Sequence, residues 1–260
     1  MLAPISPIRS RIDNLRAAMR DANVQAVLVP SSDPHVSEYL PERWQGRAFF
    51  SGFTGSMGTL VVTLDKAALF ADSRYWAQAE KELSGTGVSL VKVPQAAIRP
   101  ALDWILAELE PRQTLSFDGQ VLSLAAAQQV RGAMEAAGIQ VKSDVDLLDA
   151  AWADRPGLPD AKVYEHVAPE ATVARQAKLE EIRGAMQKAG ATHHFISSLD
   201  DIAWLLNLRG ADVTYNPVFV AHVLLDAHSA TMFIAGGKVD DALQARLAAD
   251  GVKLAPYADA

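Results

Sequence analysis

The stretch Thr59-Leu60-Val61-Val62-Thr63-Leu64-Asp65-Lys66-Ala67-Ala68-Leu69-Phe70-Ala71 contains two apolar runs separated by two charged residues. Short apolar runs of this kind predict buried strands, here over residues 59–64 and 67–71. A connection as short as Asp65-Lys66 predicts a β-hairpin. The fold is therefore expected to contain at least one antiparallel pair of strands.

On both sides of this hairpin, helices are expected to alternate with strands. Four apolar residues at helical spacing, with charged residues between them, predict an amphipathic first helix: Ile8, Ile12, Leu15 and Met19. Strands are expected at 24–29 and 88–93, and Ser73 is expected to cap a helix that ends near Leu83. Further helices are expected at 102–109, 123–137 and 145–151, with strands at 114–117 and 139–141. This order predicts an α/β fold in which helices cover a mixed sheet.

A turn-rich segment, Asp154-Arg155-Pro156-Gly157-Leu158-Pro159-Asp160, interrupts the alternation. We therefore expect a first domain over residues 1–154, a linker over 155–163 and a second domain over 164–260. In the second domain, helices are expected at 173–188, 199–206 and 240–249. Strands are expected at 192–196, 218–225, 230–234 and from 252, with a hairpin at Asp226-Ala227-His228.

The two halves can be aligned with each other. Ser31-Ser32-Asp33 falls opposite Ser198-Leu199-Asp200, and the hairpin at Asp65 falls opposite the hairpin at Asp226. The loop at Ser51-Gly52-Phe53-Thr54 falls opposite Arg209-Gly210-Ala211-Asp212. We interpret this as the duplication of one α-β-α-β-β-α-β unit. On this interpretation the second copy stops early, so we expect it to be truncated.

Composition narrows the classes of function. The chain has 260 residues, 50% of them apolar, a net charge of −7 and no cysteine. A scattered, slightly acidic charge argues against a nucleic-acid partner, and the lack of Cys excludes disulfides and thiolate metal sites. No apolar run approaches the ~18 residues that span a membrane, and residues 1–7 lack the pattern of a secretory signal. A cytoplasmic location is the default expectation.

The histidines do not form a recognisable metal motif. There is no HExxH sequence. Adjacent side chains on a strand point to opposite faces, so His193 and His194 are expected to be structural. His222, inside an apolar strand, is expected to be a satisfied core or sheet-face residue, and His228 is expected in a turn.

Other candidate motifs have local explanations. Asp33, His35 and Glu38 follow a strand end, where α/β folds place ligands, but Asp-Pro also starts turns. Three glycines within 52–58 resemble a phosphate-binding loop, yet they precede a strand and lack a lysine, so we expect tight turns and close backbone approach. Asp200 and Asp201 are expected to complement the start of a helix.

Six segments, taken together, resemble the N-terminal part of Xaa-Pro aminopeptidases (aminopeptidase P), which belong to the creatinase-like, pita-bread metallopeptidases. They occur in the family's order along almost the whole chain: SDPHVSEY (32–39), FSGFTGSMG (50–58), ADSRYWAQA (71–79), WADRP (152–156), LDDIAWLLNLRGAD (199–212) and NPVF (216–219). The resemblance implies two creatinase N-terminal-like lobes, each a mixed sheet flanked by helices, with the C-terminal catalytic pita-bread lobe absent from this chain.

The resemblance also implies what the parent protein does. It would remove the N-terminal residue from short peptides that have proline second, using two divalent ions, usually manganese, bound in its catalytic lobe. This chain would carry no catalytic residue and no metal. It would associate with its own C-terminal catalytic lobe, and the parent is expected to be a homodimer. It would shape the substrate cleft, with Arg74 facing an anionic or carbonyl group of the substrate. Five further residues would line the same cleft: Phe53, Tyr75, Asp33, His35 and Glu38.

Three alternatives remain open at this point. Arg74 is equally well explained as an arginine that holds a neighbouring loop. The chain is alternatively the N-terminal region of a creatinase-like hydrolase that uses no metal, or a non-catalytic binding module of the same superfamily. The sequence does not specify the preferred first residue of the substrate or the oligomeric state.

Overall fold

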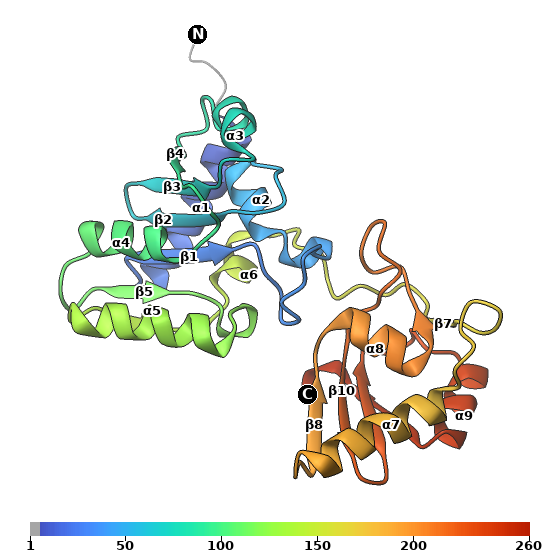
Figure 1. The fold of residues 1–260 in the computed structure, drawn as a ribbon. Coiled ribbons are helices and arrows are strands. Elements are labelled where there is room, and N and C mark those ends of the chain that lie inside the picture. Colours follow the sequence, from blue (N-terminus) through green and yellow to red (C-terminus); the bar gives the residue numbers. More distant parts are fainter. Residues whose placement is uncertain (1–5) are drawn as a thin grey trace. The chain divides into compact units, whose positions relative to one another are not determined.

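The structure, a computed structural model, describes residues 6–260 (Figure 1). The expectation about a secretory signal concerns residues that lie largely outside this range. The described chain forms two compact units. Unit 1 comprises residues 6–40 and 44–155, and unit 2 comprises residues 41–43 and 156–260. Within the described range, every helix is too short or too polar to serve as a membrane span.

Unit 1 contains a six-stranded sheet in the order β4-β3-β2-β1-β5-β6. The strands are β1 (Ala26–Pro30), β2 (Thr59–Thr63), β3 (Ala67–Ala71), β4 (Ser89–Lys92), β5 (Thr114–Ser116) and β6 (Gln140–Lys142). β2 pairs antiparallel with both β1 and β3, as the predicted hairpin requires. The remaining neighbours pair in parallel. The sheet is therefore mixed.

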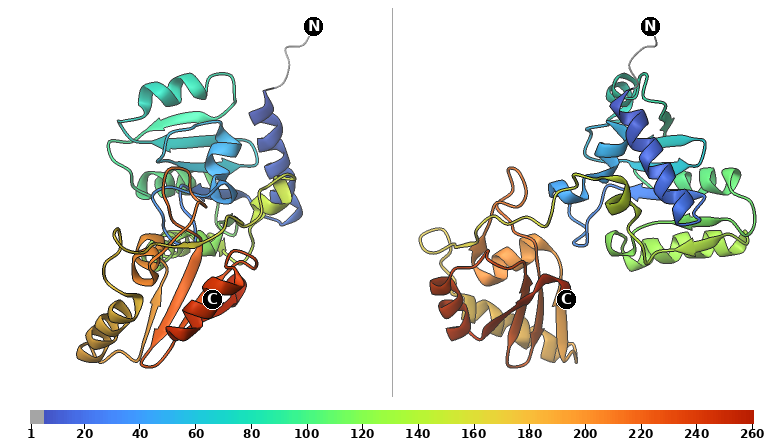
Figure 2. Two further views of the ribbon diagram at one scale, coloured as in Figure 1. Left: turned by 90° about the vertical axis from the view of Figure 1, so that its right-hand side faces the viewer. Right: turned by 180° about the vertical axis from the view of Figure 1, so that it is seen from behind.

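Helices cover both faces of this sheet (Figure 2). They are α1 (Pro7–Asp21), α2 (Gly46–Ser51), α3 (Trp76–Glu82), α4 (Arg99–Glu108), α5 (Leu124–Ala136) and α6 (Leu147–Ala151), with a short 3-10 turn η2 (Gly119–Val121) in the same unit. Another 3-10 turn, η1 (Glu42–Trp44), begins in the residues assigned to unit 2 and ends at Trp44 of unit 1. Because side chains alternate along a strand, Val27 and Val29 of β1 join a core with α1, α2, α3 and α6, whereas Ala26 and Leu28 join a second core with α4 and α5.

Unit 2 contains a four-stranded sheet in the order β12-β11-β10-β8. Its strands are β8 (His193–Ile196), β10 (Ala221–Asp226), β11 (Ala230–Ile234) and β12 (Val252–Pro256), and β7 (Tyr164–Glu165) pairs separately with β9 (Leu208–Arg209). Three helices contribute to its core: α7 (Arg175–Lys188), α8 (Leu199–Leu206) and α9 (Asp241–Ala249). A 3-10 turn, η3 (Tyr257–Asp259), follows β12.

The predicted duplication is confirmed. β8, β10, β11 and β12 pair with the same directions as β1, β2, β3 and β4: two antiparallel pairs followed by one parallel pair. The hairpins also close alike, since the N–H of Thr63 donates to the carbonyl of Lys66 (2.8 Å) and the N–H of Asp226 to that of Ser229 (3.0 Å).

Two local predictions were wrong. Ser73 does not cap a helix, because residues 72–75 form a turn in which the Asp72 carboxylate accepts the N–H of Arg74 at 3.1 Å, and α3 begins only at Trp76. The strand expected at 218–225 begins only at Ala221. The segment before it is held by Asp212, whose N–H donates to the carbonyl of Val218 (3.2 Å) and whose carboxylate accepts the N–H of Val220 (2.7 Å).

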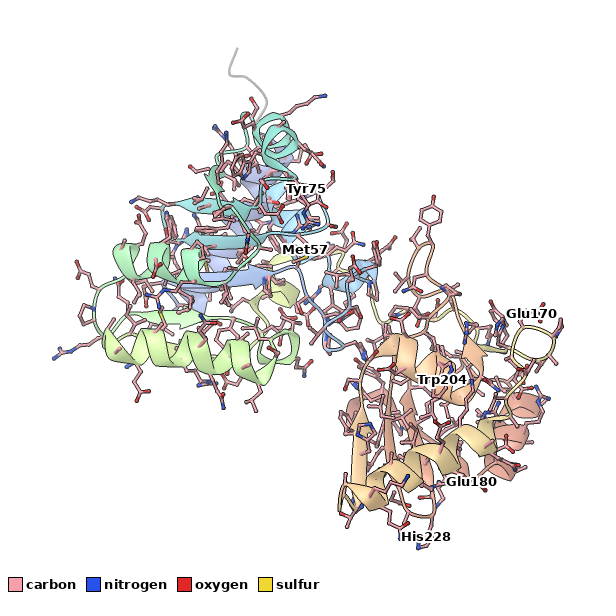
Figure 3. All side chains as sticks on the ribbon, in the orientation of Figure 1. Met57, Tyr75, Glu170, Glu180, Trp204 and His228 are labelled. Carbon is pink, nitrogen blue, oxygen red and sulfur yellow. The ribbon has the colours of Figure 1, made fainter. Side chains whose placement is uncertain are left out.

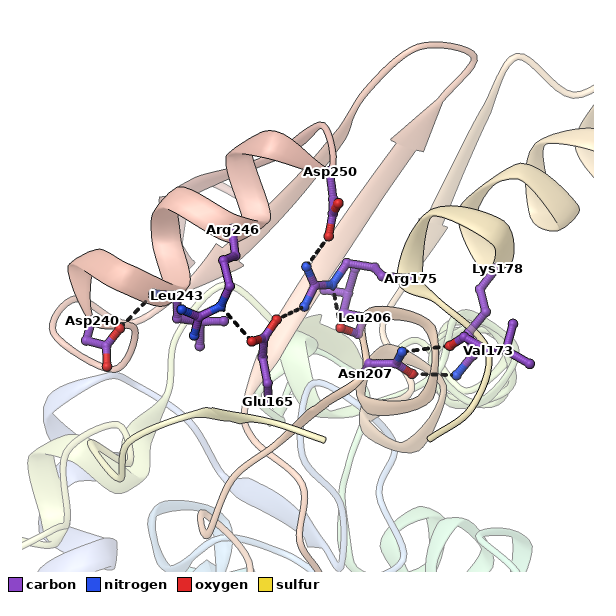
Figure 4. A network of polar contacts seen from close by, with 10 residues as sticks. All are labelled: Glu165, Val173, Arg175, Lys178, Leu206, Asn207, Asp240, Leu243, Arg246 and Asp250. Carbon is purple, nitrogen blue, oxygen red and sulfur yellow. Dashed lines mark hydrogen bonds and ion pairs between the residues drawn. The ribbon is translucent and has the colours of Figure 1, made fainter. Parts of the chain in front are cut away.

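A network of ion pairs holds unit 2 together (Figure 4). The nearly buried Arg175 guanidinium donates to the Leu206 carbonyl (2.6 Å) and to the carboxylates of Glu165 (2.7 Å) and Asp250 (2.5 Å). Arg246 reaches the same Glu165 at 2.6 Å. Burial acts to raise the pKa of Glu165, but the two guanidinium groups keep this pKa below its usual range. The network therefore fastens β7, α7 and α9 to one another.

A fully buried ion pair joins Lys238 to Asp212 in unit 2. The Lys238 ammonium also donates to the carbonyl of Pro159 at 3.2 Å, so it anchors the turn-rich segment after Arg155. One carboxylate oxygen of Asp212 is buried without a hydrogen-bond partner within the described chain. This pair is sensitive to the loss of either member, because the other would remain as an uncompensated buried charge.

Replacing Lys238 with methionine is expected to destabilise unit 2 by about 3–5 kcal/mol, because the Asp212 carboxylate would stay buried without its cation. Urea denaturation followed by amide hydrogen exchange measures the effect in each unit. The matched control is Lys66→Met. Lys66 pairs with Glu108 at the surface of unit 1 (2.6 Å), so its loss is expected to have far less effect, because water screens exposed ion pairs. Equal effects of the two substitutions would contradict the role assigned to the buried pair.

Candidate functional site

One edge of the unit 1 sheet collects the segments that the sequence singled out. β1, β3, β4, β5 and β6 run in the same direction, so their carboxyl ends meet at one edge. The register places Pro30 opposite Thr59 and Thr59 opposite Phe70. Residues 31–40, 52–58 and 72–75 therefore all leave or enter the sheet at this edge, which is where α/β folds place ligands.

Arg74 and Asp72 form a clamp at this edge. The Nε and Nη2 atoms of Arg74 donate to the two carboxylate oxygens of Asp72 at 2.9 and 2.8 Å. The Asp72 side chain is 3% exposed and that of Arg74 is 62% exposed. The hydrogen bonds from Arg74 lower the pKa of Asp72, so the carboxylate stays ionised. The clamp fixes one edge of the guanidinium and leaves the rest of its surface open to solvent.

Aromatic rings and a glycine support the clamp. The Arg74 guanidinium lies 5.2 Å from the centre of the Tyr75 ring, and this ring meets the buried Phe53 ring edge to face at 5.8 Å. The hydroxyl groups of Tyr75 and Ser56 are hydrogen-bonded at 2.7 Å. A Cβ at Gly55 would come within 2.2 Å of Phe53 and 2.8 Å of Tyr75. Only glycine therefore lets the loop close over these two rings.

The buried Arg47 of α2 fixes the glycine-containing loop of residues 52–58. Its guanidinium donates to the carbonyls of Phe53 (2.8 Å) and Gly55 (2.5 Å) and to the Ser31 hydroxyl (2.7 Å). Burial lowers the pKa of Arg47 to about 10, which leaves it charged at neutral pH. The loop thus directs two carbonyls inward to a cation. This agrees with the expectation that its glycines serve close backbone packing.

Asp33 and His35 lie in a buried turn, with exposed fractions of 0% and 5%. One Asp33 carboxylate oxygen accepts the N–H groups of His35 (3.0 Å) and Ser37 (2.9 Å), while the other is buried with no hydrogen-bond partner in the described chain. The His35 ring meets Trp44 edge to face at 6.4 Å. Glu38 is exposed, and its charge acts on Arg74. The structure thus places Arg74, Tyr75 and Phe53 in contact with one another, and it seats Asp33 and His35 in a separate turn.

A pocket of about 220 Å³ opens at the same edge, beside Asp72. Its lining is mostly apolar and includes Met57, Phe70, Val93 and Ile98. Met57 belongs to the same loop as Gly55, residues 52–58. Figure 3 labels Met57 and Tyr75. Asp72 lines this pocket, and its apolar residues Phe70, Val93 and Ile98 belong to the core on the α4 and α5 face of the sheet. Such a hollow can bind an apolar side chain.

The other predicted motifs have structural roles. Asp200 and Asp201 occupy the first turn of α8, which Ser198 caps. The nearly buried His222 ring lies between Phe195 and Tyr257, at 5.3 and 5.2 Å between ring centres, and contacts the Ser197 hydroxyl at 2.9 Å. His228 lies in the exposed hairpin of unit 2 (Figure 3). Among residues 6–260, no three His, Asp or Glu side chains are grouped in a way that could hold a metal ion.

Sequence reasoning missed three residues of the edge. Asp72 stood out only as part of the segment 71–79, and neither Arg47 nor Glu82 stood out at all. Glu82 accepts the N–H of Thr54 at 2.9 Å and its hydroxyl at 2.7 Å. The spacing Asp72-x-Arg74 was an available signal for the clamp. No local pattern links Arg47 or Glu82 to a loop several residues away, because tertiary packing makes those contacts.

Two tandem α/β modules of the same topology, with loops gathered at a carboxyl edge, define the class of protein. The family model described as the Creatinase/Prolidase N-terminal domain matches residues 11–150, and a second model with the same description matches residues 154–260. The chain belongs to the creatinase/prolidase N-terminal domain family. The predicted fold class and resemblance are thereby confirmed.

Similar proteins include aminopeptidases from several eukaryotes. The chain is 38% identical to a probable Xaa-Pro aminopeptidase P of Neurospora crassa, over 96% of this chain and 37% of the relative. It is 33% identical to Xaa-Pro aminopeptidase 1 of Dictyostelium discoideum, over 96% of this chain and 41% of the relative. The chain thus spans about two fifths of the length of these relatives.

A solved structure is also similar. The crystal structure of an X-prolyl aminopeptidase from Caenorhabditis elegans, described as a cytosolic enzyme with a di-nuclear active site, matches with a TM-score of 0.88 and 30% identity. The match covers 97% of this chain and 43% of the other. The likeness therefore extends over both units.

Replacing Arg47 with methionine is expected to destabilise unit 1 by about 3 kcal/mol, because the carbonyls of Phe53 and Gly55 would be buried without a donor. Urea denaturation, with amide hydrogen exchange of residues 53–58, measures both the global and the local effect. Arg99→Met is the matched control. Its ion pair with Asp103 is exposed, so a change of about 0.5 kcal/mol or less is expected. A loop that stays protected in the Arg47 variant would refute the anchoring role.

Proposed function

We propose that this chain is the N-terminal, non-catalytic region of a metal-dependent Xaa-Pro aminopeptidase, and that it shapes the substrate cleft of the parent. The parent would remove the N-terminal residue from short peptides with proline in the second position. The observation that carries the proposal is the tandem family match, together with the alignment of 96% of this chain to relatives that bear this name. The proposed boundaries are residues 1–154, a linker over 155–163, and 164–260.

The clamp at the unit 1 edge is the proposed wall of the cleft. Arg74 would donate from its exposed guanidinium to a carbonyl or the terminal carboxylate of the peptide, since Asp72 already fixes its orientation. Tyr75 would offer an apolar ring beside it, and the buried Phe53 would hold that ring in place. The alternative role, an arginine that holds a neighbouring loop, is less well supported, because both bonds of Arg74 go to the adjacent Asp72.

The other predicted cleft residues take narrower roles. Glu38 would add negative charge at the entrance of the proposed cleft, since its side chain is exposed and its charge acts on Arg74. Asp33 and His35 would stabilise the buried turn at 33–37, next to the entrance of the proposed cleft. None of the six residues is proposed to be catalytic.

The metal site is proposed to lie outside this chain. Residues 6–260 offer no suitable group of ligands, so no catalytic step is assigned to them. Two divalent ions, with manganese as the proposed identity, would be bound in the parent's own C-terminal catalytic lobe, with which this chain would associate. A di-nuclear site and a cytosolic setting are stated for the C. elegans enzyme. A cytoplasmic homodimer is our proposal for the parent.

Replacing Arg74 with alanine in the full-length parent is expected to raise KM for an Xaa-Pro peptide about tenfold or more, because a charge-assisted hydrogen bond to the peptide is lost. Arg74→Lys keeps the charge but not the two-point hydrogen-bond geometry. Its KM is therefore expected to lie between those of the unsubstituted protein and of the alanine variant. Steady-state kinetics measures KM and kcat of each variant. Arg99→Ala, on the exposed surface of α4, is the control. Unchanged KM and kcat in the alanine variant would contradict the proposed contact between Arg74 and the peptide.

The purified 260-residue chain with added manganese is expected not to cleave an Xaa-Pro peptide, because residues 6–260 hold no group of side chains that could bind the metal. A fluorogenic peptide assay, with and without chelator, measures this. Chelator-sensitive turnover by the isolated chain would overturn the proposal. An inactive parent that keeps the fold would instead favour the non-catalytic binding module, and turnover without metal would favour the creatinase-like hydrolase.

A further inference from the structure

One residue at the carboxyl edge of unit 1 has a backbone conformation that its side chain disfavours. Within residues 6–260, five residues other than glycine have a positive φ angle: Asn23, Val36, Arg112, Asn207 and Tyr215. Val36, with a φ of 55°, is the β-branched member of this set. Left-handed backbone suits glycine and asparagine, whereas a β-branched side chain is an outlier there. Val36 is therefore a point of local strain.

The turn at 33–37 imposes this conformation on Val36. The N–H of Val36 donates to the carbonyl of Asp33 at 3.1 Å. The Asp33 carboxylate accepts the N–H groups on either side, from His35 at 3.0 Å and from Ser37 at 2.9 Å. Because Asp33 is fully buried, these bonds anchor the turn in the body of unit 1. Strained backbone persists only where surrounding contacts over-determine it in this way.

Packing of the Val36 side chain does not offset the strain. The side chain is 63% exposed, and it belongs to neither hydrophobic core of unit 1. Asparagine or glycine at this position would fit the backbone better and would sacrifice no core contact. Strained residues of this kind cluster at ligand-binding sites. The valine side chain therefore points to a role in recognition and not in the stability of the fold.

The turn that carries Val36 lies at the sheet edge to which Arg74 also belongs. Ser31, just before the turn, donates its N–H and its hydroxyl to the carbonyl of Gly58 at 3.2 and 2.8 Å, which ties the segment to the loop of residues 52–58. Glu38, two residues after Val36, is exposed, and its charge acts on Arg74. Val36 is thus an exposed apolar side chain at the edge proposed above as the wall of the substrate cleft.

We propose that Val36 is a specificity-determining residue of the parent, which contacts an apolar side chain of the peptide residue that follows the proline. The inference rests on the proposed function, in which Arg74 binds a carbonyl or the terminal carboxylate of the same peptide. In a tripeptide, this carboxylate and this side chain belong to the same residue. Because the turn presents Val36 in one fixed position, little conformational freedom is lost when the contact forms.

The test substitution is Val36→Asn, because asparagine tolerates left-handed backbone and removes the apolar surface. The measurement is kcat/KM of the full-length parent for the peptides Xaa-Pro-Leu and Xaa-Pro-Gly. The unsubstituted parent is expected to prefer the leucine peptide. This preference is expected to fall about fivefold in the asparagine variant, as for the loss of one apolar side-chain contact. The value of kcat/KM for the glycine peptide is expected to stay the same.

Two further variants serve as controls. Val36→Leu keeps an apolar side chain and is expected to keep the preference for the leucine peptide. Leu64→Asn removes another exposed apolar side chain of unit 1, which is 40% exposed. Leu64 follows Thr63, which pairs with Ala26 at the start of β1, so it lies at the opposite edge of the sheet. Its substitution is expected to leave the preference unchanged.

Amide hydrogen exchange of residues 33–37 in the parent separates recognition from a structural role. These amides are expected to be protected at least as well in the Val36→Asn variant, because the strain is relieved. Faster exchange, or an equal loss of kcat/KM for both peptides, would overturn the inference, since Val36 would then hold the turn itself. A parent that cleaves both peptides with an unchanged preference in the variant would contradict this inference alone. A parent without turnover of Xaa-Pro peptides would contradict the proposed function and this inference with it.

Discussion

The antiparallel pairing of β2 with both β1 and β3 is the constraint on which the candidate site depends. It places Pro30, Thr59 and Phe70 in one row, so the segments that follow β1, precede β2 and follow β3 leave the sheet together. A shift of one residue would exchange the faces of every strand and would separate these loops. The register of a single hairpin therefore determines which side chains can act together at the edge.

Within that edge, buried charges do the positioning. Arg47 directs two loop carbonyls inward, and Asp72 orients a guanidinium that remains exposed. Gly55 lets the loop close over Phe53 and Tyr75. Each of these contacts is costly to leave unmade, so the loop is held in one conformation. Such a fixed surface is consistent with the peptide-recognition role proposed above.

The duplication shows how one topology serves two different environments. Both copies keep the hairpin, the strand directions and one layer of helices, and only the first is covered on both faces. Unit 2 is instead held by ion pairs around Arg175 and by the buried Lys238–Asp212 pair. A sheet with helices on a single face still has an apolar row on its other face.

Much of the fold followed from the sequence alone, because apolar periodicity is a local property. The runs at 59–64 and 67–71, the two hairpins and the repeated order of elements were all readable, and the resemblance to the family rested on six short motifs. The start of α3 was not, because the Asp72 turn competes with the Ser73 cap. The tertiary structure alone decided which candidates meet. It buried Asp33 and His35, placed Arg74 and Tyr75 against Phe53, and brought in Arg47, since long-range packing leaves no signature in a local pattern.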